Sequence, residues 1–151
     1  MKKYIVIGNP IKHSLSPKLH NYWMDKNNIE ASYDKKLVYE EDIESIINEV
    51  KKKKIQGINV TVPFKKSVIP FLDELSKESK ETQSVNTILL ENKKLIGHNT
   101  DIAGFELALK HSNYDVTNKK VFILGAGGVV PSIIFALKKM KVSKIILSNR
   151  T

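Results

Sequence analysis

The sequence predicts an α/β protein: a unit with a mostly parallel sheet, followed by the first β-α-β unit of a second sheet. Short apolar runs of strand length alternate with segments of helical periodicity along the chain, as in layered α/β folds. In the last third, a strand-like run leads directly into a glycine turn and a second helical segment. The 151 residues are 41% hydrophobic, which is enough to bury a core.

The first predicted elements follow from local patterns. Residues 4–7 form a short apolar strand that ends at Gly8-Asn9-Pro10. A helix is expected to begin at Ser16-Pro17 and to run to about residue 27, with Ser16 as its N-cap and Pro17 in the first turn. Residues 32–38 form a second strand. Residues 41–53 form a helix, because isoleucine and valine recur there at helical spacing.

The following elements complete the first sheet. Residues 57–62 form an apolar strand that stops at a proline, which cannot donate to a sheet. Short helical turns are expected over 65–81. The segments 87–90 and 95–98 flank a polar turn and predict a hairpin at the edge of the sheet. Residues 102–110 form a helix that links two domains.

The last third predicts strands at 121–124 and 144–148 with a helix between them. The turn Gly125-Ala126-Gly127-Gly128-Val129 opens a near match to the dinucleotide-binding fingerprint. Glycines let the backbone turn tightly and approach a pyrophosphate, whose charge is met by N–H groups at the helix N-terminus. An ordinary strand-to-helix turn is the alternative, and the strand before and helix after it favour the cofactor site. Val130 departs from the small residue expected at the third position, and Pro131 is tolerated in a first turn.

The end of the second strand of this unit indicates which dinucleotide would bind. A site selective for NAD carries an acidic residue there for the ribose 2′-hydroxyl, whereas this chain has Asn149-Arg150-Thr151. A guanidinium with neighbouring amide and hydroxyl groups suits a 2′-phosphate. The sequence therefore predicts NADP as the cofactor, and a surface arginine after a strand is the alternative.

Net charge and composition exclude several classes of protein. The formal charge is +9, but Arg150 is the only arginine among the 25 basic residues, and nucleic-acid readers favour arginine. A nucleic-acid partner is therefore not expected. The chain has no cysteine, which excludes disulfide scaffolds and cysteine chemistry, and its four histidines have no metal-ligand spacing. Apolar runs too short for a membrane span or a signal peptide predict a soluble, cytoplasmic protein without a membrane partner.

Polar residues at strand and helix ends in the first half suggest a ligand site. Ser14 and Ser16 place two hydroxyls at a helix start, where they could bind a small anion such as a carboxylate. Simple helix capping is the alternative, and it accounts for Ser16 but not for Ser14. Asn59 and Thr61 alternate in a strand, so they either satisfy a buried polar network or bind a polyhydroxylated ligand. Lys65 lies just beyond that strand, where ligands bind in α/β sheets, and most lysines there are only solvated.

A second group of polar residues follows the hairpin strands. Asn86 lies beside the start of one strand, and Asp101 follows the other at the start of the linking helix, where the helix dipole favours a carboxylate. Paired with a lysine, this aspartate could hold the ammonium group in place for proton transfer. A plain acidic residue in a first helical turn is the alternative.

Taken together, these motifs resemble the shikimate dehydrogenase family. The resemblance rests on short motifs in the family's order: Ser14-Leu15-Ser16-Pro17, Asn59-Val60-Thr61-Val62-Pro63-Phe64-Lys65, Val85-Asn86-Thr87, Asn99-Thr100-Asp101, Gly125-Ala126-Gly127-Gly128 and Asn149-Arg150-Thr151. It implies a substrate domain over 1–101, a linking helix over 102–112 and a partial Rossmann domain for NADP over 113–151. It also implies an enzyme that interconverts shikimate and 3-dehydroshikimate on the route to chorismate and the aromatic amino acids.

The resemblance assigns a role to each motif. Ser14, Leu15 and Ser16 bind the substrate carboxylate, and Thr61, Asn86 and Asp101 bind its ring hydroxyls. Lys65 is the acid/base and exchanges the proton with Asp101. The turn at 125–129 receives the pyrophosphate, and Asn149, Arg150 and Thr151 receive the 2′-phosphate.

Several expectations stay open at this point. The family's second domain continues beyond Thr151, so the chain is expected to be an N-terminal portion of the enzyme. A dehydrogenase that also accepts quinate, a non-catalytic substrate-binding fragment and a basic nucleic-acid module are the alternative functions. A homodimer is one expected assembly.

Overall fold

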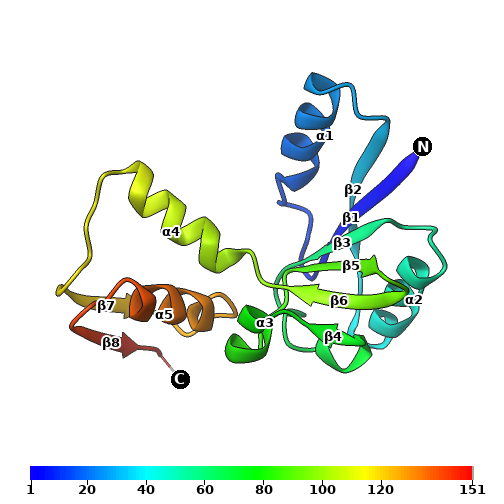
Figure 1. The fold of residues 1–151 in the computed structure, drawn as a ribbon. Helices are drawn as coiled ribbons and strands as arrows, with labels where there is room; N and C mark the ends of the chain where they lie inside the picture. The colour runs from blue at the N-terminus through cyan, green and yellow to red at the C-terminus, as the bar shows by residue number, and fades with distance from the viewer. Residues whose placement is uncertain (151) are drawn as a thin grey trace.

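The computed structural model describes residues 1–150 and contains two sheets connected by a long helix (Figure 1). The first part is built from β1 (Lys2–Gly8), α1 (Ser16–Lys26), β2 (Ala31–Leu37), the 3-10 turn η1 (Glu40–Asp42), α2 (Ile43–Lys51), β3 (Gly57–Val60), the 3-10 turn η2 (Ile69–Phe71), β4 (Glu74–Leu75), α3 (Lys77–Thr82), β5 (Thr87–Glu91) and β6 (Lys94–His98). The second part is built from α4 (Asp101–His111), β7 (Lys120–Leu124), α5 (Val130–Lys139) and β8 (Lys144–Ser148). No helix within residues 1–150 is long and apolar enough to cross a membrane.

The first sheet has the strand order β2-β1-β3-β5-β6-β4. Only β5 runs against its neighbours, pairing antiparallel with β3 and β6, so the predicted mostly parallel α/β sheet is confirmed. The hairpin is confirmed as β5 and β6, but its predicted place at the sheet edge is wrong. The two-residue strand β4 covers β6, and the flanking Asp73 and Ser76 donate backbone hydrogen bonds to Leu95 and Gly97. A strand of two residues is too short to produce a periodic sequence pattern, so helical turns were expected there instead.

Helix α2 packs on one face of this sheet and forms the main core. Its four buried residues are those that recur at helical spacing: Ile43, Ile46, Ile47 and Val50. They meet β1 and β3 side chains of the same face, including Ile7 and Ile58. Burying each of these side chains contributes about 1.5–3 kcal/mol, so this face anchors the unit.

Helix α1 covers the opposite face of the sheet, where the core is much smaller. Only Val6, Ile11 and Tyr33 form the buried cluster there. Val6 pairs with Asn59 across β1 and β3, and Asn59 pairs with Thr87 across β3 and β5. Because paired residues point to the same side of a sheet, this face carries the polar side chains of β3 and β5.

Gly8, at the end of β1, lies against the segment that follows β3 and has no room for a side chain. A Cβ at Gly8 would lie 2.6 Å from Thr61 Cγ2 and 3.0 Å from the backbone oxygen of Val62. We expect Gly8→Ala to lower the free energy of unfolding by about 1–3 kcal/mol in urea denaturation, because backbone must move. The control is Gly104→Ala in α4, where a Cβ meets nothing within 4 Å. It should raise stability by about 0.5–1 kcal/mol, and equal effects of the two changes would refute the close-approach argument.

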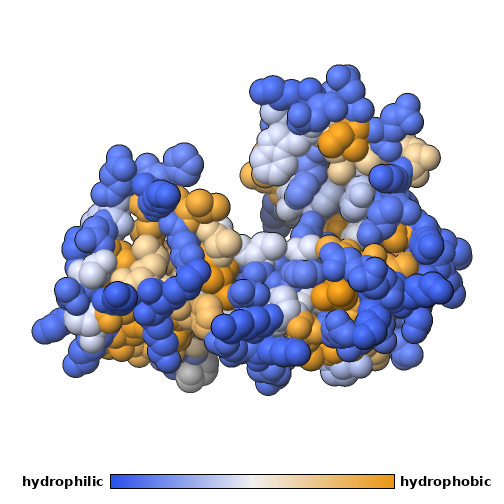
Figure 2. Space-filling view, viewed as in Figure 1, coloured by the Kyte–Doolittle hydropathy of each residue, from blue (hydrophilic) through white to orange (hydrophobic). Residues whose placement is uncertain are grey.

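The second sheet consists of β7 and β8, which pair in parallel, with α5 connecting them. This confirms the predicted β-α-β unit. Figure 2 shows the surface deeply indented between this unit with α4 and the part that carries α1. Apolar side chains of β7 and β8 are exposed, among them Phe122, Leu124 and Ile146.

Candidate functional site

Lys65 and Asp101 form an ion pair at the boundary between the two parts of the chain. Lys65 Nζ lies 2.6 Å from Asp101 Oδ2, and the two side chains are 12% and 21% exposed. The backbone fixes Lys65, since Phe64 is buried in the core and Val85 N donates to Lys65 O. Asp101 is the first residue of α4, where the helix N-terminus favours its charge. The pairing expected from the sequence is therefore present.

Asn86 orients the other oxygen of Asp101. Asn86 Nδ2 donates to Asp101 Oδ1 at 2.9 Å, and Asn86 Oδ1 accepts from Thr100 N at 3.0 Å. The carboxylate is thus held on one side by a lysine and on the other by an amide. These contacts fix the position of the ammonium group relative to both carboxylate oxygens.

The start of α1 differs in detail from the predicted capping. Helix α1 begins with Ser16 itself and has Leu15 at the N-cap position, so the prediction of Ser16 as N-cap is wrong. Instead, Ser14 Oγ accepts a hydrogen bond from Ser16 N at 3.3 Å. Pro17 lies in the first turn, as expected. Because the Ser14 hydroxyl accepts this backbone bond, the Ser16 hydroxyl does not cap the helix and interacts with the phenol of Tyr33.

A continuous row of polar side chains connects α1 with the ion pair. Tyr33 donates to Asn59 Oδ1 at 2.6 Å, and Asn59 Nδ2 donates to Thr87 Oγ1 at 3.0 Å. Thr87 donates in turn to Asn86 Oδ1 at 3.1 Å. We call this set the polar row, and its members in order are Ser16, Tyr33, Asn59, Thr87, Asn86, Asp101 and Lys65.

Thr61 lies just beyond the polar row rather than within a strand. The prediction of a strand to residue 62 is wrong, since β3 ends at Val60. Two backbone bonds continue the contact with the β1 segment past the end of β3: Thr61 N donates to Ile7 O and Asn9 N donates to Val62 O, each at 3.0 Å. The chain then turns, because Phe64 N bonds Thr61 O, and Pro63 prevents further pairing.

The glycine turn and Lys65 line the same cavity. This cavity has a volume of about 520 Å³, and its lining includes Lys65, Ser84, Ala126, Gly127 and Gly128. Gly125 has φ +103°, a conformation that favours glycine, and a Cβ at Gly125, Gly127 or Gly128 would meet no atom within 4 Å. Packing inside the protein therefore does not require these glycines, and open space remains for a ligand to approach the backbone. The turn at 125–129 fits the pyrophosphate of a dinucleotide at the start of α5.

The segment after β8 lies beside this turn. Gly125 N donates to Ser148 O at 2.7 Å, which brings the end of β8 against the first glycine. Asn149 and Arg150 follow immediately and belong to the described chain. Thr151, the third residue expected at the 2′-phosphate, lies outside the described residues. The backbone thus places Asn149 and Arg150 directly after the residue that bonds the glycine turn, in keeping with the sequence prediction of a 2′-phosphate site there.

Asn99 connects the two parts of the chain through buried hydrogen bonds that sequence reasoning missed. Asn99 Nδ2 lies 2.8 Å from Ser132 Oγ in α5, 3.0 Å from Thr82 Oγ1 and 3.1 Å from Ser84 O. Its Oδ1 accepts from Asp101 N at 3.0 Å. Asn99 is 7% exposed and Ser132 is fully buried. One amide therefore connects α5 to Asp101 at the start of α4.

The comparison with known families identifies the first unit. Residues 6–88, more than half of the chain, match the profile described as the shikimate dehydrogenase substrate binding domain. The chain belongs to the shikimate dehydrogenase family. The resemblance drawn from the motifs is thereby confirmed.

Individual members of the family match almost the whole chain. The shikimate dehydrogenase (NADP(+)) of Pelagibacter ubique is 61% identical over 150 residues, which are 99% of this chain and 57% of that protein. The crystal structure of shikimate dehydrogenase 1 from Peptoclostridium difficile superposes with a TM-score of 0.94 at 36% identity, over all of this chain and 56% of the other. That of Thermus thermophilus, in complex with NADP(H) and shikimate, has a TM-score of 0.91 at 33% identity, over all of this chain and 57% of that one. The chain spans just over half the length of the relatives it matches.

Proposed function

We propose that this chain contributes the substrate-binding and proton-transfer residues of an NADP-dependent shikimate dehydrogenase, which interconverts shikimate and 3-dehydroshikimate in chorismate and aromatic amino acid biosynthesis. The observation that carries the proposal is the Lys65–Asp101 pair, held at 2.6 Å, with Lys65 lining the cavity that reaches the glycine turn. The family membership supports it. So do the relatives named as NADP(+) enzymes and the solved relative that holds shikimate and NADP(H).

The proposed chemistry divides the reaction between cofactor and protein. NADP, bound at 125–129 and Asn149-Arg150-Thr151, supplies the acceptor for the hydride that leaves the alcohol carbon. Lys65 and Asp101 take up the proton that the hydroxyl loses as the carbon–oxygen double bond forms. In the reverse direction the same pair returns the proton to the ketone oxygen. The protein's task is to align the substrate and manage this proton.

The remaining site residues would orient the substrate. Ser14 and Ser16, with the backbone at Leu15, provide donors for a carboxylate at the start of α1. Thr61, Asn86 and Asp101 provide groups for the ring hydroxyls at the other end of the polar row. The described geometry supports this division, because Tyr33 interacts with Ser16 at one end and donates a hydrogen bond to Asn59 toward the other.

The wider organisation is part of the proposal. We assign residues 1–101 to the substrate domain, 102–112 to the link and 113–151 to the start of a cofactor domain. The match of residues 6–88 to the substrate binding domain and the separate β7–β8 sheet support this division. A cytoplasmic location and a homodimer remain predictions, and light scattering after size-exclusion chromatography tests the second.

Two measurements test the function. Calorimetry on the 151-residue chain should detect shikimate binding, with quinate as the comparison ligand. A chimera, in which this chain replaces the matching 150 residues of the Pelagibacter ubique relative, should reduce NADP when shikimate is added. Failure of both, with the unaltered relative active in parallel, would overturn the proposal. Binding without turnover in the chimera would support the non-catalytic alternative.

Arg150 gives a prediction about cofactor choice. Replacing it by aspartate should weaken NADP binding relative to NAD by about 10- to 100-fold, because a charge-assisted hydrogen bond to the 2′-phosphate contributes about 1.5–3 kcal/mol. The ratio of the two dissociation constants, measured by calorimetry, checks this. Lys144→Asp, at the other end of β8, is the control for a general charge effect. An equal change of the ratio in both variants would rule out the assignment of Arg150.

A further inference from the structure

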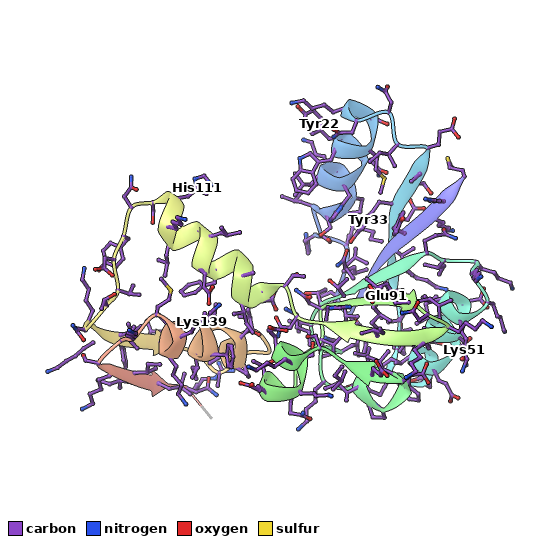
Figure 3. The ribbon with its side chains drawn as sticks, viewed as in Figure 1. Tyr22, Tyr33, Lys51, Glu91, His111 and Lys139 are labelled. Carbon is purple, nitrogen blue, oxygen red and sulfur yellow. The ribbon has the colours of Figure 1, made fainter. Side chains whose placement is uncertain are left out.

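Tyr33 is buried on a strand that is otherwise largely exposed. It lies on the edge strand β2 and is 2% exposed, whereas Asp34, Lys35 and Lys36 after it are all exposed. Figure 3 shows Tyr33 beside β2 and beneath α1. Its burial is therefore due to the packing of α1 and not to its place in the sheet.

Two residues of α1 fix Tyr33 in place. The imidazole of His20 stacks on its ring, with ring centroids 4.2 Å apart and an interplanar angle of 5°. The Asn21 side chain bonds both backbone groups of Tyr33, donating to O at 2.8 Å and accepting from N at 2.9 Å. Neither the ring nor the backbone is free to shift, so the phenol oxygen has a defined position.

The phenol oxygen lies between two residues of the proposed substrate site. It donates to Asn59 Oδ1 at 2.6 Å and interacts with the side chain of Ser16, whose influence on the phenol pKa is smaller than that of burial. Burial raises the pKa of Tyr33 to about 12, so the phenol keeps its proton, and its donor role, throughout the neutral range. Because Asn59 Oδ1 is occupied by this donor, Asn59 Nδ2 must face Thr87 and Asn86.

We propose that Tyr33 is a positioning residue for the substrate, whose hydroxyl sets the orientation of the Ser16 hydroxyl and the Asn59 amide together. Ser16 stands at the carboxylate end of the proposed site, and Asn59 holds Thr87 and Asn86 toward the ring-hydroxyl end. One phenol therefore keeps the two ends of the polar row at the separation that the substrate requires. This inference rests on the proposed function and adds a residue to which the motifs give no role.

Tyr33→Phe tests the proposal, since it keeps the ring and its stacking on His20 but removes the hydroxyl. The shikimate dissociation constant of the 151-residue chain should rise about tenfold, because the hydrogen bond to Asn59 and the interaction with Ser16 are lost and part of that loss appears on binding. The dissociation constant for NADP should stay within about twofold. In the chimera, KM for shikimate should rise while kcat changes little. Tyr22→Phe, which removes the hydroxyl of an exposed tyrosine in α1, is the matched control and should leave both constants unchanged.

A second variant separates positioning from stability. Asn59→Ala removes the amide that Tyr33 orients, so it should raise the dissociation constant for shikimate and leave that for NADP unchanged. The double variant, with Tyr33→Phe and Asn59→Ala together, should raise the shikimate constant no further than Asn59→Ala does. Additive effects, or a Tyr33→Phe chain that binds shikimate as tightly as the unaltered chain, would overturn the inference. If Tyr33→Phe does not fold, an unchanged constant in Asn59→Ala overturns it as well. Absence of shikimate binding by the unaltered chain would instead overturn the proposed function, and this inference with it.

Discussion

Replacing Lys65 by alanine should lower kcat for shikimate oxidation by about 10²- to 10⁴-fold, the usual contribution of a positioned acid/base group. The ammonium group is the only cation within hydrogen-bond distance of the Asp101 carboxylate in the described residues 1–150. Without it, no positioned group exchanges the proton as the hydride leaves. Substrate binding should weaken much less, because Ser14, Ser16, Thr61 and Asn86 remain. Steady-state kinetics of the chimera, with NADP reduction followed by absorbance, measures kcat and KM separately.

Lys51→Ala is the control for this change. Lys51 ends α2 on the far side of the first sheet and is exposed, so its removal should leave kcat and KM unaltered (Figure 3). A Lys65→Ala chimera that keeps kcat within a few fold of the unaltered one would disprove the acid/base role. A rise of KM at constant kcat would instead assign Lys65 to binding alone.

Replacing Asn99 by leucine should lower the free energy of unfolding by about 3–5 kcal/mol. Leucine is similar in size but leaves the Ser132 hydroxyl, the Ser84 carbonyl and the Asp101 N–H without their partner. Each buried group left unsatisfied costs about 1–3 kcal/mol, and part of this cost is relieved by local movement. Urea denaturation of the chain measures the change. Because Asp101 N is one of the groups released, kcat of the chimera should fall as well.

Lys139→Ala is the control for Asn99→Leu. It tests whether removing any contact between α4 and α5 lowers the free energy of unfolding by as much. Lys139 of α5 pairs with Glu106 of α4 at 3.0 Å, but its side chain is 63% exposed. Exposed ion pairs contribute about 0–1 kcal/mol, so stability should fall by no more than that. If Lys139→Ala lowered the free energy of unfolding as much as Asn99→Leu does, the buried amide of Asn99 would contribute no more than an exposed ion pair to the contact between the two parts of the chain.

The parts of the site found from sequence are those with a short-range signature. Lys65 follows β3 and the proline beyond it, Asp101 opens a helix, and the glycine turn stands between a strand and a helix. Each belongs to a motif of several neighbouring residues, and the resemblance of these motifs to the family assigned the roles that spacing had left open. The polar partners missed were single residues in ordinary surroundings. Tyr33 is one aromatic residue in a polar strand, and Ser132 is one hydroxyl in an apolar helix.

The start of α1 shows how two serines with similar sequence surroundings can differ in role. The sequence predicted Ser16 as the N-cap, and capping gave no role to Ser14. The chain instead enters the helix at Ser16, so the free backbone N–H is bonded by Ser14. The helix begins one residue earlier than predicted, and residue preferences for helix ends do not resolve a difference of one residue. Because of this one-residue difference, the Ser16 hydroxyl does not cap the helix and instead interacts with Tyr33.

The local sequence determined most strands and helices, since isoleucine and valine at periods of two and of nearly four residues can bury only one face. It also determined the glycine turn, because a positive φ excludes most other residues. Only the tertiary structure decided which polar groups meet. Tyr33 and Asn59 are 26 residues apart, Asn99 and Ser132 are 33, and Lys65 and Asp101 are 36. Hydrogen bonds form over about 3 Å, so such pairs depend on how strands are ordered in the sheet and where helices cross it.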